Sequence, residues 1–238
     1  MSKFYKNIFI DLDNTLWDFE VNSKDTIEDI FYKYGIDRAG TFKEFYPVYK
    51  EINKFLWGEL KKQRITKDFL CWNRFFMTNE KFGISDEILA RNMGNDYLIL
   101  SPKKTKLLPN CIELLEYLKA NYKVFLITNG FKEVQYSKIK ACGIENYFDK
   151  VFTSEEVGHT KPNKEYFLHV INETCSKIDE SIVIGDDLEN DIQGANNIGM
   201  DSIWLNLKAV VQNEVFPKYE VRNLLEIMEL LVLSEPRF

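Results

Sequence analysis

The sequence predicts an α/β fold: a doubly wound parallel sheet covered by helices on both faces, with a second, all-helical domain inserted after the first strand. Short apolar segments that end in polar residues alternate with helical patterns from about residue 105 onward, which is typical of strand–helix units. Residues 18–100 interrupt this alternation with helical patterns alone. We therefore place the core domain at 1–17 and 101–238 and the helical domain at 18–100.

The strands are predicted from short apolar runs. Residues 8–10 (Ile-Phe-Ile) are too short for a helix and lack polar alternation, so they indicate a strand buried on both faces. Residues 124–127 and 182–184 are similar, and residues 151–153 and 202–205 are weaker versions.

Helical spacing of apolar residues predicts the remaining elements of the core domain. These helices cover residues 111–118, 133–142, 163–175, 189–198 and 224–231. Gly143 and Gly199 end two of them. The last helix could cover the sheet or form a dimer seam, and we favour the sheet.

The inserted domain is predicted to contain four helices, at residues 22–34, 41–57, 66–81 and 85–100. Asn22 with Asp25, and Thr41 with Glu44, have the spacing of capping boxes. Pro47 falls inside the second pattern, so that helix is expected to be kinked or to begin there.

Composition narrows the class of protein. The net charge of −6 without a basic stripe argues against a nucleic-acid polymer or an anionic membrane as partner. No segment has the length of a membrane span or the pattern of a signal peptide. The cysteines are widely spaced, without a C-x-x-C pair, and are expected to be buried free thiols, in preference to disulfides or zinc ligands: Cys71, Cys111, Cys142 and Cys175. These features indicate a soluble cytoplasmic protein.

Asp11 and Asp13 directly follow the first strand. Two carboxylates this close repel each other, which raises one pKa unless a cation lies between them. Magnesium suits such a site because it prefers hard oxygen ligands. A nucleophilic carboxylate beside one that carries a proton is also what a two-step phosphoryl transfer needs. The alternative is that both are ordinary acids of a turn.

Further acids follow the strand at 182–184, namely Asp186, Asp187 and Asp191. Helix capping accounts for one acid at a helix start, but three within six residues at a sheet edge indicate a cation site.

Two more polar segments complete this edge. The hydroxyl of Thr128 and the backbone N–H groups beside Asn129 could hold phosphate oxygens, although Thr-Asn-Gly is also a good turn. Lys161 could balance the charge of a nucleophile and a phosphate. Because ligands of doubly wound sheets bind beyond the carboxyl ends of the strands, these side chains are expected to converge.

Together the four segments resemble the haloacid dehalogenase-like hydrolase superfamily. The matching residues are Asp11, Asp13, Thr15, Thr128, Lys161, Asp186 and Asp191. The resemblance implies a Rossmann-like core with an α-helical cap inserted after the first strand, Mg²⁺ as cofactor, and hydrolysis through an aspartyl-phosphate.

The resemblance also implies roles. Asp11 is the nucleophile, and Asp13 protonates the leaving group and then activates water. The metal site consists of Asp11, Asp13 through its backbone carbonyl, and Asp186, with Asp191 outside it. Asp187 is placed outside it as well, although some relatives bind the metal from this position. Thr128 and Lys161 grip the phosphoryl group, together with Asn129 and Thr15.

Several segments resemble the pyrimidine 5′-nucleotidase branch in particular: Phe131-x-x-x-Gln135, Tyr147-Phe148-Asp149, residues 154–158 and Asn53-Lys54-x-Leu56-Trp57. This implies a small phosphate substrate, namely a nucleoside 5′-monophosphate. The helical domain is rich in aromatic residues, most of which are expected to pack internally. Asn53, Trp57 and Arg74 are the candidates for substrate contact.

Other functions are compatible with parts of this pattern. A phosphosugar phosphatase or mutase shares all four segments. A haloalkanoate dehalogenase shares the nucleophile but has no use for Asp13 and a magnesium site. A phospho-accepting regulatory or binding module also joins strand-end acids, a Thr and a Lys, but needs no lid. The protein is expected to be a monomer or a homodimer.

Overall fold

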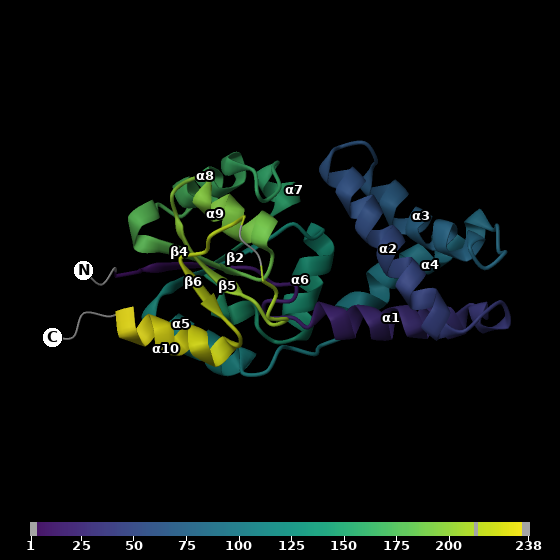
Figure 1. The fold of residues 1–238 in the computed structure, drawn as a ribbon, viewed down its shortest axis with the longest axis horizontal. Coiled ribbons are helices and arrows are strands. Elements are labelled where there is room, and N and C mark those ends of the chain that lie inside the picture. Colours follow the sequence, from purple (N-terminus) through teal and green to yellow (C-terminus); the bar gives the residue numbers. More distant parts are fainter. Residues whose placement is uncertain (1–3, 212–213, 235–238) are drawn as a thin grey trace. The chain divides into compact units, whose positions relative to one another are not determined.

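The computed structural model describes residues 4–211 and 214–234. The chain forms two compact units (Figure 1). One, the core unit, consists of Met1–Phe19 and Thr105–Phe238, and the other, the helical unit, consists of Glu20–Lys104. The chain thus crosses between units at 19/20 and 104/105, whereas the sequence pattern places the boundaries at 17/18 and 100/101.

A fully parallel sheet forms the centre of the core unit, with strand order β3-β2-β1-β4-β5-β6. The strands are β1 Asn7–Ile10, β2 Lys123–Thr128, β3 Lys150–Thr153, β4 Ser181–Gly185, β5 Asp201–Leu205 and β6 Tyr219–Val221. The five predicted strands are confirmed. The sequence reasoning missed β6 because its three residues lack an apolar run, so only pairing with β5 defines it.

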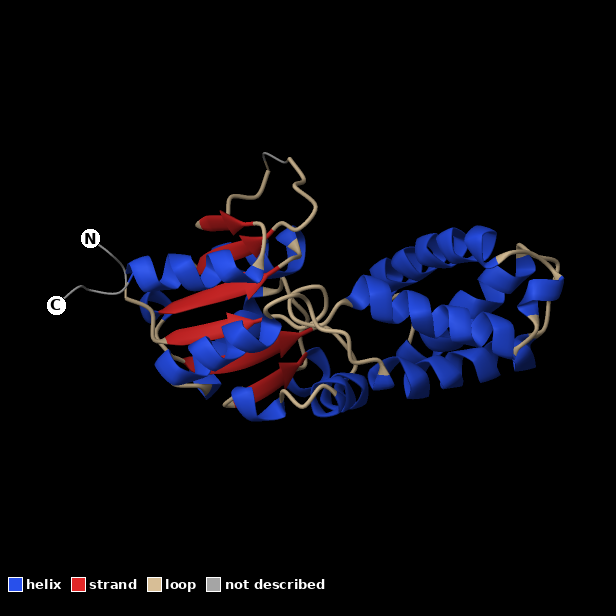
Figure 2. Cartoon of the chain, turned by 90° about the horizontal axis from the view of Figure 1, so that it is seen from below, coloured by secondary structure: helices blue, strands red, loops and turns tan. Residues whose placement is uncertain are grey.

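Helices cover both faces of this sheet (Figure 2). Their bounds are α5 Cys111–Asn121, α6 Lys132–Ala141, α7 Ser154–Val157, α8 Lys164–Glu173, α9 Gly194–Asn196 and α10 Leu224–Ser234, with 3₁₀ turns at Glu145–Tyr147 and Ile178–Glu180. Ile8 and Ile10 pack into the apolar cluster that contains residues of α5 and α10, whereas Phe9 packs into the cluster that contains residues of α8. Successive residues of β1 therefore face opposite layers, and the prediction that α10 covers the sheet is confirmed.

One predicted helix differs in form. Residues 189–198 were expected to make a single helix, but a π-helix spans Leu188–Gln193 and the short α9 follows it. The wider π-turn lies where Asp191 and Asp187 meet, next to the end of β4. The apolar spacing alone does not distinguish it from an α-helix.

The helical unit contains the four predicted helices, which pack around an interior rich in aromatic residues. They are α1 Phe19–Lys33, α2 Phe42–Lys61, α3 Lys67–Glu80 and α4 Glu87–Leu100, with 3₁₀ turns at Ile36–Arg38 and Ser101–Lys103. The ring of Phe31 packs against Phe42 and Phe45, and Tyr49 packs against Phe75. Most aromatic residues of this unit pack internally, as predicted, although Tyr32, Phe55 and Phe69 are exposed.

The helix starts test the predicted caps. Thr41 and Glu44 form the predicted capping box. The box at Asn22 is wrong, because α1 begins at Phe19 and Asn22 lies inside it. Likewise, α2 does not begin at Pro47, since it starts at Phe42 and continues past the proline.

All four cysteines are free thiols, and Cys71 and Cys111 are buried as predicted. The prediction of burial is wrong for Cys175, which lies exposed beyond the end of α8, and Cys142 is only partly buried. Across residues 4–211 and 214–234, the structure contains no helix of the length and apolarity that a membrane crossing requires.

Candidate functional site

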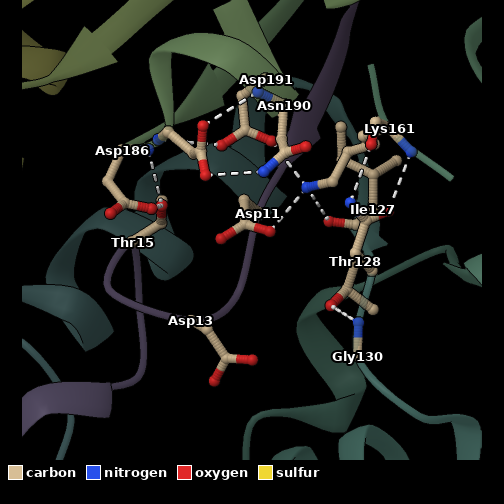
Figure 3. Close-up of polar contacts among 12 residues, drawn as sticks. Asp11, Asp13, Thr15, Ile127, Thr128, Gly130, Lys161, Asp186, Asn190 and Asp191 are labelled. Atoms are coloured by element: carbon tan, nitrogen blue, oxygen red, sulfur yellow. Dashed lines mark hydrogen bonds and ion pairs between the residues drawn. The ribbon is translucent and has the colours of Figure 1, made fainter. Parts of the chain in front are cut away.

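Polar residues from three adjacent strands meet at the carboxyl edge of the sheet. Asp11 follows β1, Thr128 ends β2, and Asp186 follows β4. Because β1 pairs with both β2 and β4, these ends are neighbours although they lie far apart in the sequence (Figure 3). The predicted convergence therefore occurs.

Lys161 is at the centre of this group and is 2% exposed. Its Nζ donates to Oδ1 of Asp11 at 2.7 Å, to Oδ1 of Asp191 at 2.6 Å and to the carbonyl of Ile127 at 3.1 Å. All three N–H bonds of the ammonium thus have acceptors, which offsets the cost of burying its charge. Lys161 fixes Asp11 and Asp191 relative to the end of β2.

Asp191 reaches this position because of Gly185 at the end of β4. A Cβ at Gly185 would lie 2.2 Å from Oδ2 of Asp191, closer than any side chain permits. The same Oδ2 accepts the backbone N–H of Asp187 at 3.2 Å. Both carboxylate oxygens of Asp191 are therefore engaged by the protein.

Asp186 contacts Thr15. The hydroxyl of Thr15 donates to Oδ1 of Asp186 at 3.4 Å and accepts the Asp186 backbone N–H at 3.1 Å. Thr15, which the sequence reasoning assigns to phosphate binding, thus contacts Asp186 through both hydrogen bonds. Thr15 orients an acid of the site.

Burial and mutual repulsion disfavour the charged forms of these acids. Burial raises the pKa of Asp11 to about 7, and although Lys161 opposes the rise, Asp191 and Asp13 add to it. Burial raises the pKa of Asp186 to about 9, with Asp11 and Asp191 adding to the shift. Burial works against the ammonium form of Lys161, but the acids outweigh it and raise that pKa as well. One buried ammonium thus faces three carboxyl groups, so full ionisation of all three would leave excess negative charge.

The oxygens of Asp11, Asp186 and Asp191 are arranged as metal ligands would be. One oxygen from each lies within 4.8 Å of the others. Hard carboxylate oxygens with unbalanced negative charge fit Mg²⁺ better than a soft metal. Both oxygens of Asp191 are engaged by Lys161 and the Asp187 backbone, whereas Asp11 pairs with Lys161 through Oδ1 alone, so Asp11 and Asp186 are the side chains better placed to bind an ion.

The side chain of Asp13 points away from this acidic group (Figure 3). Its Oδ1 accepts from Nζ of Lys138 at 2.5 Å, and its Oδ2 accepts from Nε2 of Gln135 at 2.9 Å. The carboxylate is therefore unlike a metal ligand in this structure, which is compatible with the expectation that Asp13 offers only its backbone carbonyl.

Thr128 and Asn129 are both held in place by hydrogen bonds. The hydroxyl oxygen of Thr128 accepts from Nε2 of Gln135 at 2.6 Å and from the backbone N–H of Gly130 at 3.1 Å. The side chain of Asn129 clamps the backbone of Lys161, donating to its carbonyl at 2.9 Å and accepting its N–H at 2.8 Å. Asn129 thus positions Lys161, while its backbone remains at the strand end.

Asp187 has a structural role that explains its presence. Its Oδ1 accepts the backbone N–H groups of Glu189 and Asn190, and its Oδ2 accepts from the side chain of Asn190. These contacts cap the π-helix, which gives Asp187 a role that does not depend on a metal.

The three substrate candidates belong to the helical unit. Arg74 is buried, donates to Oδ1 of Asn53 at 3.2 Å, and stacks 4.2 Å from the ring centre of Tyr97. Asn53 and Trp57 are partly exposed. Arg74 therefore orients Asn53 from inside the helical unit, and Asn53 and Trp57 are the candidates that solvent reaches.

Lys138 and the interactions of Gln135 were missed in the sequence. Gln135 was noted only as part of a family pattern, and Lys138 resembled any surface lysine of a helix. The available signal was their spacing of three residues, which places both on one face of the helix that follows Thr128.

Comparisons with known proteins agree with this geometry. The family model for haloacid dehalogenase-like hydrolases matches residues 5–199. The HAD-hydrolase YfnB of Bacillus subtilis is 28% identical over 96% of both chains. Its crystal structure bound to magnesium superposes with a TM-score of 0.87 at 26% identity, covering 96% of this chain and 99% of that one.

Two further relatives are named as pyrimidine 5′-nucleotidases. YjjG of Escherichia coli is 33% identical, covering 94% of this chain and 96% of its own. PynA of Streptococcus pneumoniae is 28% identical, covering 96% and 95%. The family match and the near-complete coverage show that this chain belongs to the haloacid dehalogenase-like hydrolases.

Proposed function

We propose that this protein is a Mg²⁺-dependent phosphatase that hydrolyses small phosphate monoesters, pyrimidine nucleoside 5′-monophosphates above all, through a phosphorylated Asp11. The observation that supports this most strongly is the buried carboxylate of Asp11 at the end of the central strand, 2.7 Å from Lys161 and grouped with Asp186. The other oxygen of Asp11, Oδ2, has no hydrogen bond within the described residues, so it is available to attack phosphorus.

In the first step, Asp11 forms a bond to phosphorus while the bond from phosphorus to the ester oxygen breaks. Asp13 gives its proton to that oxygen, so the product leaves as an alcohol. In the second step, Asp13 takes a proton from water, which attacks the phosphoaspartate. Phosphate leaves and Asp11 is restored.

Three other groups stabilise the transferring phosphoryl group. Lys161 supplies positive charge next to Asp11. Thr128 accepts two hydrogen bonds, so its own hydroxyl hydrogen is available to a phosphoryl oxygen. Mg²⁺, held by Asp11, the Asp13 carbonyl and Asp186, would supply further positive charge to the phosphoryl oxygens.

The substrate proposal depends on the relatives and on the helical unit. YjjG and PynA are pyrimidine 5′-nucleotidases by name and match nearly the whole chain, helical unit included. Asn53, held by Arg74, offers an amide that can pair with the edge of a base, and Trp57 offers a ring that can stack on one.

The test is phosphate release from a panel of monoesters with and without Mg²⁺. The panel contains UMP, CMP, dTMP, AMP, GMP and several sugar phosphates. We expect Mg²⁺-dependent hydrolysis with the highest kcat/KM on pyrimidine nucleotides. A preference for sugar phosphates would replace the nucleotidase assignment by the phosphosugar phosphatase alternative. No hydrolysis of any monoester would contradict the proposed chemistry.

A further inference from the structure

Helix α6 contains a buried lysine that the proposed mechanism leaves unused. Lys138 is 3% exposed, and its Nζ lies 2.5 Å from Oδ1 of Asp13. The same ammonium lies 4.0 Å from the ring centre of Trp17 and 5.7 Å from that of Phe19. Two aromatic rings and one carboxylate thus surround the charge.

Such burial is costly unless the charge has a partner. Moving an ammonium out of water costs several kcal/mol, and cation–π contacts recover only part of this. The ion pair with Asp13 is therefore what makes a lysine tolerable here. The exposed lysines of α6, such as Lys132 and Lys140, carry no such cost.

Gln135, one turn earlier on α6, engages the other oxygen of Asp13. Its Nε2 donates to Oδ2 of Asp13 at 2.9 Å and to the hydroxyl oxygen of Thr128 at 2.6 Å. Gly130 makes room for this amide, because a Cβ at Gly130 would lie 2.3 Å from Nε2 of Gln135. One face of α6 thus gives each oxygen of Asp13 its own donor.

We propose that Lys138 is a positioning residue that holds Asp13 by Oδ1 throughout the reaction, which leaves Oδ2 to exchange its hydrogen bond with Gln135 for one with the leaving-group oxygen. This inference rests on the proposed phosphatase function. Oδ1 can accept the hydrogen bond from Lys138 in both states of Asp13, as one oxygen of the carboxylate and as the carbonyl oxygen of the acid protonated at Oδ2. The proton passes between Asp13 and the ester oxygen in the first step, and between water and Asp13 in the second.

The two donors have unequal roles for a geometric reason. The amide of Gln135 has a second acceptor in Thr128, so it can release Asp13 and remain bonded. Lys138 is enclosed by Trp17 and Phe19, so its contact with Asp13 is the one that persists.

A leaving group that needs no proton provides a way to isolate this role. Phenyl phosphate and 4-nitrophenyl phosphate are almost the same shape, but 4-nitrophenolate is a much better leaving group than phenolate. Loss of a well-placed acid therefore slows hydrolysis of phenyl phosphate more than that of 4-nitrophenyl phosphate. Loss of general structure slows both equally.

The experiment compares kcat/KM of wild type, K138M and K140M on these two compounds with Mg²⁺. The quantity kcat/KM reports the first step, in which the leaving group departs. We expect K138M to lower kcat/KM for phenyl phosphate about 10-fold or more beyond its effect on 4-nitrophenyl phosphate. K140M, which removes an exposed lysine of the same helix, is expected to leave both values within about 2-fold.

The ratio of the two kcat/KM values does not depend on the fraction of folded enzyme. An equal loss on both compounds, or no loss, would overturn the role of Lys138. If K138M is insoluble, K138Q replaces it, because an amide keeps a donor without the charge, and a smaller shift in the same direction is expected. Wild-type enzyme that hydrolyses neither compound would instead contradict the proposed function.

Discussion

The carboxyl edge of the sheet and the interior of the helical unit each contain a buried cation, but the groups that surround it differ. At the edge, Lys161 has three acceptors and faces three carboxyl groups. In the helical unit, the buried Arg74 contacts a carbonyl, an amide oxygen and aromatic rings, and its Nη2 has no partner among the described residues. The edge therefore gathers more carboxyl groups than one ammonium can balance, which suits a metal cation. The helical unit instead surrounds its buried charge with neutral polar and aromatic groups.

The largest expected effect comes from removing the nucleophile at the edge. D11N keeps the size of the side chain but is a far weaker nucleophile, so kcat should fall by at least about 10⁴-fold. Steady-state phosphate release from the best substrate of the panel measures this. D179N, which changes an exposed acid of the same unit, serves as control. Undiminished turnover by D11N would contradict the assignment of Asp11 as the nucleophile.

The next effect concerns the metal and depends on pH. The pKa values of Asp11 and Asp186 are raised to about 7 and about 9, so from about pH 4 to 9 the folded protein binds more protons than the unfolded chain. Its stability without metal should therefore fall as pH rises through this range. Mg²⁺ needs the deprotonated forms, so it should raise Tm more at pH 8.5 than at pH 6.

Thermal unfolding with and without Mg²⁺ at both pH values tests this. D186N should lose most of the Mg²⁺-dependent increase, whereas D179N should keep it. An equal increase in Tm at both pH values, or an unchanged response of D186N, would show that the ion binds elsewhere.

A smaller effect is expected from the helical unit. N53A removes the amide that Arg74 orients, and one lost hydrogen bond of about 1 kcal/mol corresponds to a roughly 5-fold lower kcat/KM on the preferred nucleotide. Hydrolysis of 4-nitrophenyl phosphate, which has no base, should change less than about 2-fold. N92A, at an exposed position of α4, is the matched control. Equal losses on both substrates would mean that Asn53 does not select the substrate.

The smallest effect is on stability alone. T41A breaks the capping box at the start of α2, in which Thr41 exchanges hydrogen bonds with Glu44. It should lower the free energy of unfolding of the helical unit by about 1 kcal/mol and leave kcat/KM unchanged. T66A, which removes a single capping bond at α3, should cost less. Urea denaturation of both variants gives the comparison, and a larger cost for T66A would contradict it.

Much of the fold could be predicted because apolar runs and helix caps are visible in short stretches of the sequence. The strand at Ile8–Ile10 is apolar on both faces, and the four helices of the inserted unit have caps or apolar faces visible in sequence. The misses have local causes too. β6 is short and defined by its partner, and Asn22 has the residue type of a cap but lies inside a helix.

Sequence reasoning also finds the candidate residues of the edge, because each comes directly after a predicted strand or before a predicted helix. It does not find which of these residues contact one another. The contact of Thr15 with Asp186, and that of Asn129 with the backbone of Lys161, depend on how segments far apart in the chain pack together.

The sequence by itself thus determined the fold class, the strand-end acids of Asp11 and Asp186, and the family. Only the tertiary structure decided that a lysine of α6 lies buried against Asp13, and that Arg74 is an interior residue which orients Asn53. The physical reason is that a periodic pattern records which face of an element is apolar. The neighbour of a buried charge is set by packing across elements, and no local pattern records that.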